Sequence, residues 1–220
     1  MADVLPGYTF NPSTNQYRSN ATGQFVSRRN IVSLLDANVT AGENRLAALT
    51  IAAHDGRLSP SAFAEQFSAE IRRLHLQNAS LGAGGWANMT QSDYGRVGGK
   101  LTADYRRVEG FAQAIANGEI TLPQALNRAR LYAGNARTQY WEAVESRLTA
   151  RPGMVQIERR QLGASEHCGD CVNYYERGWQ PLGTLPSPGE GSECLAGCKC
   201  TKVYREVDIL VVGEWLGTRR

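Results

Sequence analysis

Between residues 31 and 149, apolar positions recur at steps of three and four, which is the period of an amphipathic α-helix. A first helix is predicted from Ile31 to His54, because Gly56 suits the left-handed backbone conformation just past a helix end. A second helix begins at Ser59-Pro60. Its apolar stripe consists of Phe63, Phe67, Ile71 and Leu74.

Glycines at positions 82, 84 and 85 interrupt this periodicity, so a hinge or loop is predicted there. A third helix is predicted from about Ser92 to Asn117, and a last one from about Leu126 to Ala150. The segments 55–59 and 117–121 have similar sequences, and each is followed closely by a proline and a helix. They indicate two related helical hairpins, or else two turns that obey the same capping rules.

After Pro152-Gly153 the pattern changes from helical to extended. β-branched residues dominate the segments 154–158 and 203–212, which predicts strands on either side of a loop rich in Gly, Pro and Cys. So few strands cannot bury a hydrophobic core unaided. This smaller module therefore needs a further source of stability.

The first 29 residues are rich in Asn, Ser, Thr, Gly and Tyr, and the turn-forming segment 20–23 lies between Tyr17 and Phe25. They are predicted to form an extended N-terminal arm with a small hairpin. Such an arm is either a disordered leader or a segment that docks onto a neighbouring subunit. No secretory signal is recognised and no apolar run approaches about 20 residues, so synthesis in the cytoplasm without membrane insertion is expected.

All cysteines follow residue 167, and their number is odd. Closely spaced cysteines in a reducing cytoplasm are more often metal ligands than disulfides or free thiols, although these two alternatives remain. The candidate ligands of a structural zinc ion are Cys168, Cys171, Cys194, Cys198 and Cys200. The Cys-x-x-Cys pair is expected to bind first, and the second pair is open among the other three.

The predicted fold class is therefore α+β. A mainly α-helical body spans residues 30–150, and a small β-rich module held together by zinc spans residues 151–220. Four thiolate ligands leave no open coordination position for water or substrate. The chain is accordingly expected not to be an enzyme. The enzymatic alternative is a nucleophilic Cys168 or Cys171 with a histidine base, and the candidate bases are His54, His75 and His167.

A second alternative is a zinc-ribbon module that binds nucleic acid through basic residues near the cysteines. These residues are Arg159, Arg160, Lys199, Lys202 and Arg205. The net charge of +3 is too small for the strong positive field of a dedicated nucleic-acid binder, so charge does not indicate DNA contact. Short basic pairs such as Arg159-Arg160 usually mark a solvated face.

Cys168-x-x-Cys171 is followed by a spacer with Gly183 and the segment 186–188, and then by Cys198-Lys-Cys200 leading into a strand. This arrangement resembles the C-terminal signature of phage Mu-like minor head, or head-morphogenesis, proteins. The resemblance covers roughly residues 100–212. In that family the terminal element is His-x-x-Cys-Arg-Cys; here the histidine is absent, Cys194 lies one position further away, and the chain is shorter than typical members.

This resemblance implies a structural virion protein of a tailed bacteriophage without catalytic activity, made in the host cytoplasm and then incorporated into the virion. Its partners would be other head proteins, namely capsid, portal or connector subunits, and a homo-oligomer is compatible with that role. The fourth zinc ligand stays open, because the family histidine has no counterpart in this sequence.

Overall fold

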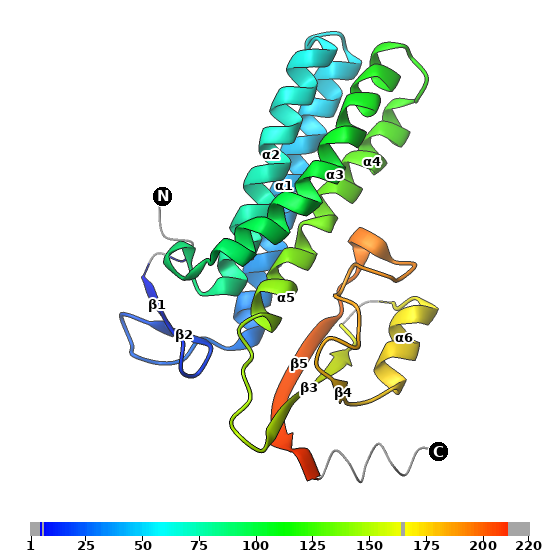
Figure 1. The fold of residues 1–220 in the computed structure, drawn as a ribbon. Coiled ribbons are helices and arrows are strands. Elements are labelled where there is room, and N and C mark those ends of the chain that lie inside the picture. Colours follow the sequence, from blue (N-terminus) through cyan, green and yellow to red (C-terminus); the bar gives the residue numbers. More distant parts are fainter. Residues whose placement is uncertain (1–4, 6, 164–165, 211–220) are drawn as a thin grey trace.

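The computed structural model describes residues 5, 7–163 and 166–210, and it combines a long helical body with a small β-rich lobe at one end (Figure 1). The helices are α1 (Arg28–His54), α2 (Pro60–Ala83), η1 (Trp86–Asn88), α3 (Gln91–Ala116), α4 (Leu122–Asn135), α5 (Arg137–Glu145), α6 (Gly169–Glu176) and η2 (Leu195–Gly197). The strands are β1 (Tyr8–Asn11), β2 (Gln16–Ser19), β3 (Met154–Gln161), β4 (Gln180–Pro181) and β5 (Thr201–Asp208). The α+β prediction is confirmed. Within the described ranges no helix is both long and apolar enough to span a bilayer.

The helical body is built on α1 and α2, with α4 against α1 and both α3 and α5 against α2. Its core contains the predicted apolar stripe of α2, and the ring of Phe67 contacts the rings of Phe63, Phe111 and Tyr132 at centroid distances of 4.9 to 5.6 Å. Burial of these side chains is the main stabilising term for the body, because isolated helices are marginal in water.

The two related turns have the same hydrogen-bonding pattern. Gly56 and Gly118 both have positive φ angles, 72° and 68°, and their N–H groups donate to Ala53 and Ile115 respectively, each three residues back. The residues that follow them, Arg57 and Glu119, each donate to a carbonyl five residues back. Figure 1 shows both turns at the end of the body that lies farthest from the β-lobe. The two predicted hairpins therefore share their turn geometry.

One glycine of the predicted hinge sets how closely two helices approach. α2 continues through Gly82 and ends at Ala83, and a Cβ atom on Gly82 would clash with the carbonyl oxygen of Tyr140 in α5. We expect Gly82→Ala to lower the free energy of unfolding by about 2 kcal/mol, because the helices must separate. Gly98→Ala, at an exposed α3 position where an added Cβ meets no atom within 4 Å, is expected to raise it by about 0.5–1 kcal/mol.

Urea unfolding of the two variants measures this difference. Equal effects of Gly82→Ala and Gly98→Ala would contradict the close approach of α2 and α5.

The last predicted helix begins at Leu122, earlier than expected, also ends earlier, and is divided in two. α4 ends at Asn135, α5 begins at Arg137, and helical structure stops at Glu145 instead of near residue 150. At the break, the Asn78 side chain donates a buried hydrogen bond of 3.2 Å to the carbonyl oxygen of Ala136. A side chain from α2 thus supplies the hydrogen bond that this backbone carbonyl needs at the break. The hydrophobic periodicity of the sequence does not reveal this contact.

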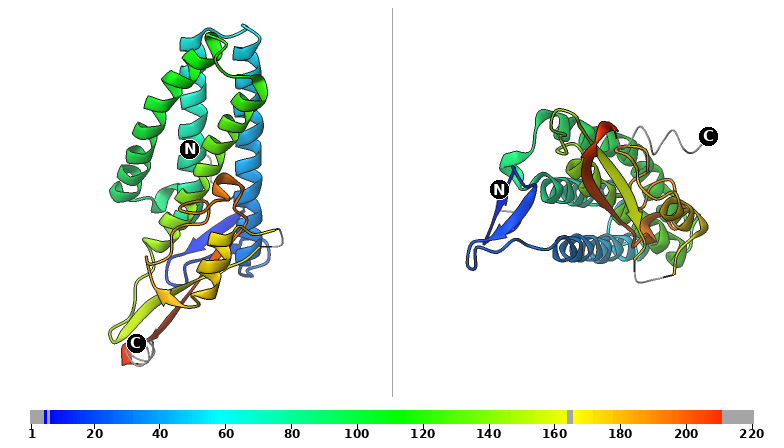
Figure 2. Two further views of the ribbon diagram at one scale, coloured as in Figure 1. Left: turned by 90° about the vertical axis from the view of Figure 1, so that its right-hand side faces the viewer. Right: turned by 90° about the horizontal axis from the view of Figure 1, so that it is seen from below.

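The N-terminal arm contains the predicted small hairpin, because the Val26 N–H donates to the Tyr17 carbonyl oxygen and Arg18 pairs with Phe25. β1 and β2 form an antiparallel hairpin. The predicted turn at 20–23 follows β2, and it brings Phe25 back into a short antiparallel pairing with Arg18. Tyr17 is buried and its hydroxyl donates to the carbonyl oxygen of Leu81, at 2.8 Å. Figure 2 shows the hairpin beside the same end of the body as the β-lobe. Tyr17, Phe10 and Val26 therefore anchor the arm to its own chain, while most other described arm residues are exposed.

The β-lobe is a three-stranded antiparallel sheet in the order β4-β3-β5. β5 begins at Thr201 and ends at Asp208, so it is shorter than the predicted strand, and Ile209 and Leu210 are helical. Residues 211 and 212 of the predicted strand lie outside the described residues. α6 packs on β3, and η2 packs on α4 of the helical body.

His75 is a buried histidine inside the helical body. Both of its ring nitrogens lack a hydrogen-bond partner; Asp104 lies 3.7 Å from Nε2, and Lys100 lies nearby. Burial, followed by the charge of Lys100, lowers the pKa of His75 from 6.5 to about 4. The unfolded chain therefore binds a proton at His75 more tightly than the folded protein does. The contribution of His75 to the free energy of unfolding is fully present above pH 6.5 and falls by about 3 kcal/mol as the pH drops to 4.

Urea unfolding between pH 7 and 4 tests this dependence. Asp104, whose pKa is raised by burial, acts in the opposite direction, so the comparison with His75→Gln isolates the histidine. We expect His75→Gln to lose much less stability than the wild type over this range, and His54→Gln, at an exposed position, to behave like the wild type. Parallel curves for His75→Gln and the wild type would contradict the prediction.

Candidate metal centre

The Cys-x-x-Cys pair lies at the start of α6. Cys168 is the residue that precedes the helix, with extended backbone angles, and Cys171 lies in its first turn. Both sulfur atoms are therefore near the positive end of the helix dipole, which favours the thiolate form that metals bind. Cys171 is buried, with 1% of its surface exposed, whereas Cys168 is partly exposed.

The other three cysteines lie on η2 and on the segment that leads into β5. Cys194 and Cys198 flank η2 at its two ends, so one short turn separates them. Cys200 immediately precedes β5, and Cys198 and Cys200 are each 1% exposed. The structure thus brings all five predicted candidates to one place between α6, η2 and the start of β5.

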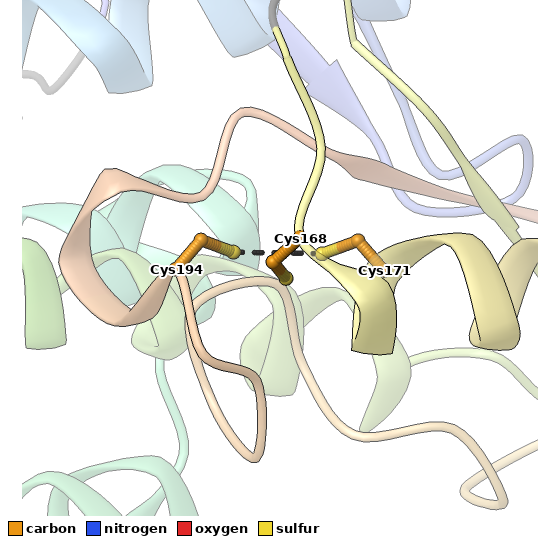
Figure 3. Close-up of side chains that lie close together, drawn as sticks. All are labelled: Cys168, Cys171 and Cys194. Carbon is orange, nitrogen blue, oxygen red and sulfur yellow. Dashed lines mark hydrogen bonds between the residues drawn. The ribbon is translucent and has the colours of Figure 1, made fainter.

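The sulfur atoms lie at separations typical of metal ligands. Cys171 Sγ is 3.5 Å from Cys194 Sγ and 3.7 Å from Cys198 Sγ. Two ligands of one tetrahedral zinc ion, with Zn–S bonds of about 2.3 Å, are roughly 3.8 Å apart. The sulfurs of Cys168, Cys171 and Cys194 lie within 4.8 Å of one another (Figure 3), as do those of Cys171, Cys198 and Cys200. This arrangement can hold a metal ion, and Cys171 belongs to both groups.

The thiols influence one another's ionisation. A hydrogen bond with Cys200 is the main reason that the pKa of Cys198 is lowered, to about 4, and the same bond raises the pKa of Cys200. Burial raises the pKa of Cys171. Adjacent thiolates repel each other, which opposes ionisation of all five thiols in the absence of a cation. A divalent ion would supply the compensating charge and displace the remaining protons.

Backbone and side-chain contacts fix the segments that carry the cysteines. The Glu193 N–H donates to Asp170 Oδ2 at 2.9 Å, and the Tyr174 hydroxyl donates to the Gly191 carbonyl oxygen at 2.6 Å. Both bonds connect α6 with the loop ahead of Cys194. At Gly163, any side chain would press against the carbonyl of Lys199. These contacts hold the cysteine-bearing segments in place, which preorganises the site for an ion.

Two of the basic residues considered for nucleic-acid contact are buried, which corrects the expectation that Arg159-Arg160 marks a solvated face. Arg160 and Lys202 are 0% exposed. Lys202 Nζ lies 2.5 Å from Glu158 Oε2 and 2.6 Å from Glu145 Oε1, and it donates to the Leu185 carbonyl oxygen. Neither side chain is exposed to contact a phosphate, and Lys202 instead links Glu158 of the lobe with Glu145 of the helical body.

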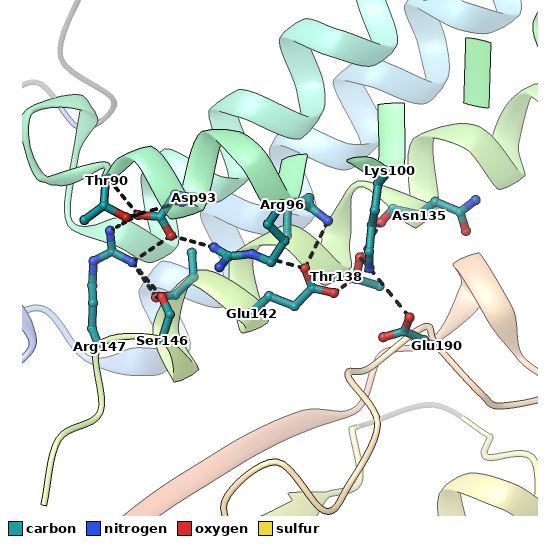
Figure 4. A network of polar contacts seen from close by, with 12 residues as sticks. Thr90, Asp93, Arg96, Lys100, Asn135, Thr138, Glu142, Ser146, Arg147 and Glu190 are labelled. Atoms are coloured by element: carbon teal, nitrogen blue, oxygen red, sulfur yellow. Dashed lines mark hydrogen bonds and ion pairs between the residues drawn. The ribbon is translucent and has the colours of Figure 1, made fainter. Parts of the chain in front are cut away.

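A further ionic network connects the cysteine loop with the helical body (Figure 4). Glu190, in the loop, lies 3.6 Å from Lys100 of α3, and Lys100 also pairs with Glu142 of α5. At the far end of the network, Arg147 pairs with Asp93 at 2.7 Å. Although burial alone would raise it, the pKa of Asp93 is held well below its usual value by hydrogen bonds from Arg147, Thr90 and Arg96.

The three histidines lie in different surroundings. His54 is exposed at the end of α1, and His75 is buried within the helical body. His167 is the histidine that approaches a cysteine: its Nδ1 lies 3.8 Å from Cys200 Sγ. The sequence did not imply this contact, and it places an imidazole beside the cysteine cluster.

The buried ion pair of Glu158 and Lys202 was also missed at the sequence level, although one signal was present. Charged and polar residues occupy every second position in part of β3, so they share one face of the strand. Antiparallel pairing places Glu158 opposite Tyr204 and Arg160 opposite Lys202. A polar face of this kind can either be exposed to solvent or be buried with its charges paired, and the sequence does not distinguish the two.

Comparison with protein-family models, with curated proteins and with solved structures finds no match for this chain. The resemblance to head-morphogenesis proteins therefore rests on the cysteine motif and the segments around it.

Proposed function

We propose that the chain is a structural protein of a tailed bacteriophage virion, and that zinc bound by its cysteines fastens the C-terminal lobe to the helical body. The observation that carries the proposal is the position of the cysteine cluster. Its ligands come from α6, η2 and the start of β5, and η2 itself packs on α4. An ion there would join these segments at the junction of lobe and body.

The chemistry of the donors favours zinc in a structural role. Thiolates are soft ligands, and zinc is the common partner of clustered cysteines that need no redox chemistry. Three of the five thiols are almost completely buried, so an ion coordinated by them is shielded from substrates. The surrounding lobe is small, and charged side chains take up part of its interior, so its hydrophobic core contributes little stability. A bound ion would supply stability that this core lacks.

The role in the virion comes from the motif. The Cys-x-x-Cys pair, the proline-containing spacer and the Cys198-Lys-Cys200 element that runs into β5 support a place among minor head proteins. In that role the helical body and the lobe would bind capsid, portal or connector subunits.

The test is to purify particles produced by the genome that encodes this chain and to identify their proteins by mass spectrometry. The proposal expects the chain to band with intact particles at a constant ratio to the major head protein. Particles that lack the chain, or failure of that genome to produce particles, would overturn the virion role and leave the metal site unaffected.

A further inference from the structure

We propose that the cysteine cluster binds two metal ions that share the thiolate of Cys171 as a bridge. This inference rests on the proposed metal site and concerns how many ions it takes. It begins from the arrangement of the sulfur atoms, which form two groups of three with Cys171 in common.

A single tetrahedral ion requires four donors that all lie about 3.8 Å from one another. Within the described part of the chain, the closely spaced sulfurs instead occur as Cys168, Cys171 and Cys194 on one side and Cys171, Cys198 and Cys200 on the other. Cys171 is at contact distance from Cys194 in the first group and from Cys198 in the second, at 3.5 and 3.7 Å. The sulfur donors thus form two triads that share Cys171.

Beside each triad lies a further donor of the kind that zinc accepts. Beside Cys168, carboxylate oxygens of Asp170 and Glu193 lie within 4.8 Å of its sulfur and of each other. Beside Cys200, His167 Nδ1 lies 3.8 Å away. Two tetrahedral ions with one shared ligand need seven donors in all. Five thiolates, one of these carboxylates and the imidazole supply that number.

Charge balance is consistent with two ions. Five thiolates and one carboxylate around two divalent ions leave the same residual charge as four thiolates around one ion. With one ion, a fifth cysteine would remain as a spare thiol in the cluster. With two ions, every cysteine has a role, including the almost fully buried Cys198 and Cys200.

Native mass spectrometry of the full chain, refolded with excess Zn²⁺ and then desalted, tests the number of ions. We expect two zinc ions per chain. One ion would overturn the bridged pair and leave the proposed structural site standing, whereas none would overturn both.

Variants then test the bridge. Cys171→Ser is expected to lose both ions together, and His167→Ala to lose one ion and keep the other. His54→Ala, at an exposed position on α1, is the matched control and should retain two. If Cys171→Ser still holds two ions, or if His167→Ala leaves the count at two, the shared-thiolate arrangement is wrong.

A cadmium-loaded sample gives a readout that does not depend on stability. Two bridged ions in different donor sets are expected to give two ¹¹³Cd resonances with mutual coupling through the shared sulfur. A single resonance from the fully loaded protein would contradict the proposal.

Discussion

If the cysteine cluster binds zinc as proposed, removing the metal is expected to lower the melting temperature of the β-lobe by at least about 10 °C. A bound ion would join three segments of a lobe that has little hydrophobic core of its own, so its loss would remove on the order of 5 kcal/mol of stability. Cys171→Ser should reproduce the effect of a chelator, because Cys171 belongs to both groups of ligands. Differential scanning calorimetry with and without a high-affinity chelator measures the shift.

The control for this experiment is Asn173→Ala, at an exposed position on the same helix as Cys171. It should melt like the wild type and respond to the chelator equally. The chelator should cause no further shift in Cys171→Ser. If that variant bound no metal yet melted at the wild-type temperature, the ion would have no structural role.

Lys202→Met is expected to destabilise the protein by about 3–5 kcal/mol, which corresponds to roughly 10 °C in melting temperature. The substitution removes the cation from between Glu158 and Glu145, and Glu158 is fully buried. A buried carboxylate without its partner is costly, whereas the methionine itself fits an apolar interior. Chemical denaturation followed by tryptophan fluorescence measures the change.

Two comparisons make this prediction specific. Lys199→Met changes a side chain that is half exposed and should cost no more than about 0.5 kcal/mol. The double variant Glu158→Gln with Lys202→Met should lose less stability than Lys202→Met alone, because no carboxylate remains unpaired at position 158. A double variant less stable than the single one would show that the ion pair is not the source of the effect.

The helical body could be predicted from sequence because long stripes such as Phe63, Phe67, Ile71 and Leu74 admit one secondary structure. The turn at Gly56 was equally accessible, since its backbone conformation is local. The break at Ala136 was not, because it depends on Asn78, a residue far away in sequence. Local patterns thus predict the elements, and long-range contacts decide where they end.

The candidate site shows the same division. The spacing of Cys168 and Cys171 was enough to name them as the first ligand pair, and the structure places them together at the start of one helix. Sequence could not divide Cys194, Cys198 and Cys200 into ligands and non-ligands, because their separations depend on how η2 packs on α4. The proximity of His167 to Cys200 and the burial of Lys202 likewise arise only from tertiary packing.

The most direct test of the metal site is X-ray absorption at the zinc K-edge on freshly purified protein. The account predicts bound zinc whose first coordination shell is mainly sulfur at about 2.3 Å. Protein that is folded without zinc, or zinc surrounded only by oxygen and nitrogen, would contradict it.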